Sequence, residues 1–126
     1  MSDVLDRLLK PEVEIVSKNL PRKGYRMKRL SEQAGEDVVF TVQALPYGRI
    51  EEIVESGVSD VKLHTVLAGV VEPDLKSPAL REKFGGATPA ETVKAMLLSG
   101  EVLDLARAIE RLTGYGSTTI QEIKKN

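Results

Sequence analysis

The spacing of hydrophobic residues changes near Pro46, from every second position to the spacing of a helix. In Val38–Leu45, β-branched and aromatic residues alternate between two faces, which is typical of a half-buried strand. Tyr25–Leu30 is the second strand candidate. The polar stretch Ser31–Asp37, which contains a glycine, would connect the two. We therefore predict an antiparallel hairpin formed by Tyr25–Leu30 and Val38–Leu45.

The residues before this hairpin carry weaker signals. Residues 3–9 place several hydrophobic side chains on one side of a short helix, which Pro11 would end because the residue before a proline disfavours the helical region. Val13 and Ile15 alternate with acidic residues, a weak indication of a strand. Asn19–Gly24 contains turn-forming and basic residues, so we expect a loop there.

After Pro46 hydrophobic residues recur three and four positions apart, which predicts helices. The first expected helix is a short one around Ile50–Val54, ended by Gly57, and the second is a buried helix from Val61. A third starts at Ser77-Pro78, and a fourth has a capping box at Thr88 and Glu91. The last runs from Ser99 to a Gly114 cap. In the last helix, Val102, Leu105, Ala106, Ile109 and Leu112 form the apolar stripe. Asp104, Arg107, Glu110 and Arg111 lie on its solvent side, with opposite charges spaced to pair.

The run Val66–Val71 fits either a helix or a strand. We favour a helix, because the stretch is long enough and Ser59-Asp60 offers a cap. With strands first and helices afterwards, the class is α+β: an N-terminal hairpin or small sheet followed by a bundle of four or more helices. Residues 1–126 form one domain in this interpretation, with 117–126 as a short helix or a flexible tail.

Composition excludes several kinds of chemistry. The chain has 126 residues, 41% of them hydrophobic, enough for one core without disulfides or metals. It contains no cysteine, which excludes disulfides, thiolate nucleophiles and cysteine-ligated metal, and fits a reducing cytoplasm. No apolar run is long enough to cross a membrane, and the first residues do not resemble a signal peptide. We expect a cytosolic protein with no membrane association.

Charge is unevenly distributed along the chain. Residues 1–30 carry eight Lys and Arg against four Asp and Glu, whereas residues 31–60 carry one against seven. The segment Lys18–Arg29 holds six cations around Tyr25 and is the best argument for nucleic-acid binding. The competing interpretation is a solvated strand edge whose cations discourage edge-to-edge pairing. We favour the edge, because the net charge of the chain is −1.

Catalytic signals are absent from the sequence. His64, the only histidine, lies in an apolar stripe without a second His or Cys, so a structural role is expected. Gly85-Gly86 precedes a helix but lacks the spacing and the lysine of a phosphate-binding loop, which favours a helix-to-helix turn. No nucleophile elbow is present. We expect no enzyme activity, no cofactor and no metal site.

Five segments of the second half of the chain occur in an order that resembles a known family. They are Leu67–Leu75 (LAGVVEPDL), Leu80–Gly85 (LREKFG), Ala87–Glu91 (ATPAE), Met96–Val102 (MLLSGEV) and Ile109–Gly116 (IERLTGYG). This order resembles the XkdN-like tail assembly chaperones of Bacillus-type phages and prophages, and the likeness covers most of residues 25–116. The chain departs from the expected pattern at Ser99, where a proline would precede the Gly-Glu pair.

The resemblance implies a non-catalytic protein that binds the tail tape measure protein and keeps it soluble while the tail tube assembles. It implies a place in the bacterial host cytoplasm and absence from the mature virion. The tail tube protein is a further candidate partner, and self-association is another alternative. The alternatives from other classes are a small nucleic-acid-binding module using residues 18–29 and a structural tail protein, such as a terminator or connector.

A binding surface for such a partner is expected among apolar residues that the core does not need. Tyr115, Ile120 and Ile123 follow the last well-defined helix, and the two isoleucines are spaced to share one helical face. These three residues are the candidate partner-binding site. The alternative is an ordinary C-terminal helix that packs back on the bundle.

Overall fold

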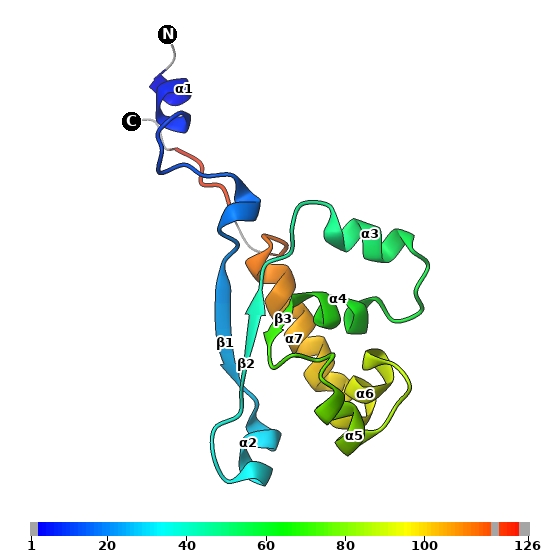
Figure 1. Cartoon of the computed structure of the whole chain (residues 1–126). Coiled ribbons are helices and arrows are strands. Elements are labelled where there is room, and N and C mark those ends of the chain that lie inside the picture. Colours follow the sequence, from blue (N-terminus) through cyan, green and yellow to red (C-terminus); the bar gives the residue numbers. More distant parts are fainter. Residues whose placement is uncertain (1–2, 117–118, 124–126) are drawn as a thin grey trace.

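A computed structural model describes residues 3–116 and 119–123, and it confirms the α+β class (Figure 1). Three strands form one antiparallel sheet in the order β1-β2-β3. Helices α3 to α7 lie on one side of this sheet, and the segment that precedes β1 extends away from both (Figure 1). Among the described helices, none combines the length and the hydrophobicity that a bilayer crossing requires.

The predicted pairing of two N-terminal strands is confirmed, but the bounds of the first strand were wrong. Strand β1 is Arg22–Arg26 and strand β2 is Val39–Gln43, with Tyr25 opposite Phe40. Strand β1 therefore includes part of the expected loop. It ends early because the chain turns into a helix, α2.

Helix α2, Lys28–Ala34, replaces the expected end of the first strand and most of the expected polar connection. It contains good helix formers, and Gly35 ends it with a positive φ of 77°. The hydroxyl of Ser31 is buried and accepts a hydrogen bond from the Val38 N–H at 2.9 Å. This bond holds α2 against the start of β2, so the polar residues serve a helix and not a loop.

The sheet has a third strand that sequence reasoning assigned to a helix. Helix α4, Val61–Gly69, ends at Gly69, and β3, Val70–Glu72, pairs with β2. The helical interpretation of Val66–Val71 is thus correct up to Gly69 and wrong for the last two valines. Val70 is buried and lies opposite Val42, so sheet pairing decides the conformation of these β-branched residues.

The expected bundle of four or more helices after Pro46 is confirmed. Besides α4, its helices are α3 (Arg49–Glu55), α5 (Pro78–Phe84), α6 (Pro89–Met96) and α7 (Ser99–Leu112). Gly57, with a positive φ, follows the end of α3 as predicted. At the end of α7, Gly114 has a φ of 106°, and the next N–H bonds back to the Glu110 carbonyl.

Side chains cap most of these helices where the sequence indicated. The Asp60 carboxylate accepts from the Leu63 N–H, and the Ser77 hydroxyl accepts from the Ala79 N–H. At α6 the Thr88 hydroxyl accepts from the Glu91 N–H at 3.2 Å, while the Glu91 carboxylate accepts from Ala87, one residue before the expected position. The capping box is therefore present in a shifted form.

The hydrophobic core lies between the sheet and helices α4, α6 and α7. Phe40 and Val42 of β2 face α7, which also packs against α4. The predicted stripe of α7 is confirmed, with Leu112 half-buried and the other four residues fully buried. The remaining face of β2 is solvated, as is usual for an antiparallel sheet with helices on one side.

The segment before β1 does not contribute to this core. It contains helix α1 (Asp3–Leu8) and a short 3-10 helix, η1 (Val16–Lys18). All side chains from Asp3 to Asn19 are exposed, and we call this segment the N-terminal arm. The expected strand at Val13 and Ile15 is wrong, because the sheet that the described residues form contains only β1, β2 and β3.

Candidate protein-binding site

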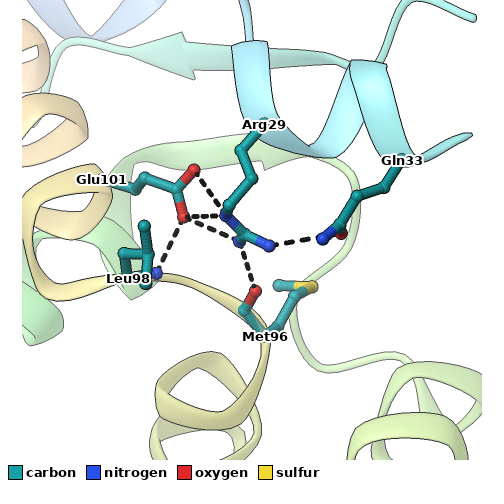
Figure 2. A network of polar contacts seen from close by, with 5 residues as sticks. All are labelled: Arg29, Gln33, Met96, Leu98 and Glu101. Carbon is teal, nitrogen blue, oxygen red and sulfur yellow. Dashed lines mark hydrogen bonds and ion pairs between the residues drawn. The ribbon is translucent and has the colours of Figure 1, made fainter.

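Arg29 and Glu101 form an ion pair that joins α2 to the start of α7 (Figure 2). The Arg29 Nη2 atom lies 2.8 Å from Glu101 Oε1 and 2.9 Å from the Met96 carbonyl oxygen. Glu101 also accepts a hydrogen bond from the Leu98 N–H at 2.7 Å, which caps α7. The Glu101 carboxylate thus both caps the start of α7 and binds Arg29 of α2.

The protonation of this pair follows from its surroundings. Burial raises the pKa of Glu101, but hydrogen bonds from Arg29 and from the Leu98 N–H outweigh burial, so the net pKa lies below its ordinary value. The hydrogen bond to Glu101 raises the pKa of Arg29. Both groups are therefore charged at neutral pH.

Beside this ion pair lies an open groove of about 500 Å³ between β1–α2 and α7, which we call the α7 groove. Its apolar lining consists of Tyr25, Met27, Leu105 and Ala108. Its charged lining consists of Arg26, Lys28, Arg29, Arg107 and Arg111, opposed by Glu101 and Asp104. The groove is therefore apolar at its base and mainly positive at its rim.

Two of the five cations are already paired, and three are not. Arg26 bonds to Asp37 at 2.8 Å, and Arg29 bonds to Glu101. Within the described part of the chain, Lys28, Arg107 and Arg111 have no acidic partner. The opposite charges on α7 do not pair along the helix as predicted.

The reason for this difference lies on another helix. Glu110 bonds to Lys62 of α4 at 2.8 Å, and no ion pair forms between α7 residues that the structure describes. The spacing of residues along α7 alone does not show that Glu110 pairs with a residue on the neighbouring helix α4. Among the described residues, Arg107 and Arg111 therefore have no ion-pair partner.

The basic segment Lys18–Arg29 does not form one continuous free patch. Strand β1 is an edge strand, as the favoured interpretation requires. Its Arg22 donates to Gln43 at 2.7 Å, and Lys23 lies over the Tyr25 ring at 5.7 Å. Most cations of the segment thus contact their own neighbours.

The three candidate partner-binding residues lie after α7 but not on a shared helix. Tyr115 is 45% exposed, and its hydroxyl donates a hydrogen bond to the Glu51 carboxylate. That bond raises the pKa of Tyr115 and lowers that of Glu51. Ile120 and Ile123 are 83% and 87% exposed, and residues 119–123 contain no helix. The remaining residues of the predicted C-terminal helix lie outside the described ranges.

The remaining candidates from the sequence are His64 and the Gly85-Gly86 pair. His64 is half-buried on α4, and the described residues contain no cluster of acidic, His or Cys side chains suited to a metal. Gly85 and Gly86 form the turn between α5 and α6 that we predicted. A Cβ on Gly86 would lie 2.8 Å from the Thr92 N atom, so this glycine permits a close backbone approach.

Sequence reasoning missed two surfaces. It placed apolar residues on one side of the first helix but did not show that the whole N-terminal arm is exposed. It also missed the α7 groove, because that groove depends on where α2 packs. The available signal was Arg107 and Arg111, two arginines one helical turn apart.

The α+β fold thus leaves both apolar and cationic side chains exposed. The family model of the phage XkdN-like tail assembly chaperone protein (TAC) matches residues 5–125. The chain therefore belongs to the XkdN-like phage tail assembly chaperone family, which confirms the resemblance. This is a family of assembly proteins and not of enzymes.

A solved structure agrees with this assignment at the level of the fold. The crystal structure of the protein yqbn has a TM-score of 0.65 and 21% sequence identity, covering 86% of this chain and 94% of that chain. At this identity the likeness supports a shared fold only. Among curated proteins no significant match was found.

Proposed function

We propose that this chain binds the tail tape measure protein and keeps it soluble while the tail tube assembles. Family membership supports a role with tail proteins. The observation that carries the proposal is the set of large apolar side chains left exposed at both ends of the described chain. They are Val4, Leu8, Leu9, Val13, Ile15 and Val16 on the N-terminal arm, and Ile120 and Ile123 after α7.

Exposed apolar side chains of this number need an explanation. Water contact with them is unfavourable, and clusters of them on soluble proteins usually mark binding sites. A tape measure protein is expected to be long and helical, with apolar stripes that are uncovered until the tube encloses them. Tyr115, Ile120 and Ile123 are proposed to contribute to its binding, in the host cytoplasm and not in the finished virion.

Co-expression tests this function. A tape measure protein from the phage or prophage that encodes this chain is expressed with and without it, and its soluble fraction and co-purification are measured. We expect a larger soluble fraction and capture with the chaperone present. Absence of both would contradict the function, and presence of the chain in purified particles would favour a structural tail protein.

Variants of the same experiment test the site. Ile120→Asp with Ile123→Asp should reduce capture, because charge replaces the apolar contact. Val54→Asp is the control for adding a charge at an exposed apolar position elsewhere, since Val54 is also exposed but lies on α3. Equal capture by the double variant and the control would show that the two isoleucines are not part of the site.

A further inference from the structure

The α7 groove combines unpaired cations with an apolar base, and we propose that it binds an acidic, amphipathic segment of a partner protein. The proposal rests on the proposed function in one respect, because it takes the tape measure protein as the source of that segment. The occupant is defined by its chemistry: carboxylate side chains that alternate with apolar ones.

The cations supply the charge complementarity. Arg107 and Arg111 lie one turn apart on α7, and Lys28 lies across the groove on α2. None of the three has an acidic partner among the residues described, and all are exposed. An arginine guanidinium matches a carboxylate with two parallel hydrogen bonds, so acidic side chains are the natural ligands at this rim.

The base of the groove selects for apolar side chains between those carboxylates. Tyr25 and Met27 line it from the strand side, and Leu105 and Ala108 line it from α7. The small Ala108 side chain leaves room where a larger residue would fill the groove. A volume of about 500 Å³ accommodates several side chains of a peptide.

The occupant is elongated, because the cations also border a second hollow. Arg107 and Arg111 line a space of about 300 Å³ on their other side, together with Ile50 and Tyr115. The two arginines thus stand between two hollows. A chain that crosses them reaches Tyr115, which connects the α7 groove to the proposed site after α7.

The groove suits a protein better than a nucleic acid. Glu101 and Asp104 line it, and Glu110 lines the second hollow. Asp104, which has no cationic partner among the described residues, would repel a continuous phosphate backbone, and the chain as a whole has a net charge of −1. A peptide can place its acidic side chains at the arginines and apolar ones elsewhere.

Peptide titrations test the proposal directly. Overlapping labelled peptides that span the tape measure protein are titrated with the full chain by fluorescence anisotropy, alongside a single-stranded oligonucleotide of similar length. We expect the peptides that bind to be acidic and amphipathic, and their affinity to fall as NaCl is raised. Failure of every peptide to bind, or tighter binding of the oligonucleotide, would overturn the proposal.

Charge reversal locates the site. Arg107→Glu with Arg111→Glu should weaken peptide binding by about tenfold or more, because repulsion replaces two charge-assisted contacts. Arg81→Glu with Lys83→Glu is the control, since it changes the net charge equally on the exposed surface of α5. Circular dichroism checks that the variants fold, and Arg107→Gln with Arg111→Gln provides a milder pair. Equal losses in the test and control pairs would overturn the proposal.

Capture of the whole tape measure protein separates the proposed function from the proposal that the α7 groove is the binding site. If the unmodified chain captures it and the Arg107 and Arg111 variant captures it equally, the groove proposal fails and the function stands. If the unmodified chain captures nothing, the function fails and the peptide titrations decide the groove. Self-association that the same charge reversal abolishes would replace the partner segment with a second copy, and would overturn the proposal.

Discussion

At the scale of the residue, Gly69 shows how one position governs the packing of two helices. It ends α4, and a Cβ built on it would lie 2.6 Å from Cδ1 of Ile109 on α7. Carbon atoms cannot approach so closely, so the absence of a side chain permits the observed contact between α4 and α7. The glycine also precedes β3, where the chain leaves the helix for the sheet.

Gly69→Ala should therefore lower the free energy of unfolding by about 1–3 kcal/mol, because the new methyl group overpacks the core. Urea denaturation measures this change. Gly100→Ala is the control: it lies in α7, where its added Cβ would have no atom of a neighbouring element within 4 Å, and it should be neutral or stabilising by up to about 1 kcal/mol. Equal effects at the two positions would contradict this account.

At the scale of the element, α2 and α7 show what could be read from the sequence and what could not. The stripe of α7 was predictable because its apolar residues recur within one helix. Helix α2 was missed because Lys28–Ala34 is mostly polar and carries no such stripe. Its position depends on contacts with distant residues, including Arg29 to Glu101 and Ser31 to Val38, which no local pattern encodes. The groove beside it was unpredictable for the same reason.

The contact of α2 with α7 should depend on pH. The folded pKa of Glu101 lies below its unfolded value of about 4.3, so its ion pair stabilises the fold above that pH and is lost as pH falls through the folded pKa. A double-mutant cycle with Arg29→Gln and Glu101→Gln measures the coupling. We expect favourable coupling near neutral pH that declines as the solution becomes more acidic than about pH 4. Coupling that is constant across this range would contradict a charged pair.

At the scale of the whole molecule, the fold separates a core from two exposed ends. The sheet and its helices contain the buried residues, whereas the N-terminal arm and residues 119–123 contain none. Alternation in Val38–Leu45 and helical spacing after Pro46 predicted the core. The spacing of apolar residues could not show that the arm stays exposed, because an apolar stripe indicates a buried face but does not identify the residues that cover it.

Removal of residues 1–16 should leave the free energy of unfolding within about 1 kcal/mol of the full chain, because surface residues contribute little to stability. Removal of residues 1–24 is the informative comparison, since it deletes three of the five residues of β1 and the Pro21 carbonyl that accepts from the Ala44 N–H. This longer truncation should destabilise strongly. Denaturation of both truncated chains measures the difference, and a large loss in the shorter truncation would show that the arm packs on the core.

The exposure of the arm also bears on the lifetime of the chain. Endoproteases cleave backbone that can open without disrupting a core, and the arm and residues 119–123 have that property. Cleavage at either end would remove apolar side chains while the core from Leu20 to Gly116 stays folded. A bound partner that covers these ends would protect them from cleavage, so chains bound to a partner would be degraded more slowly than unbound chains.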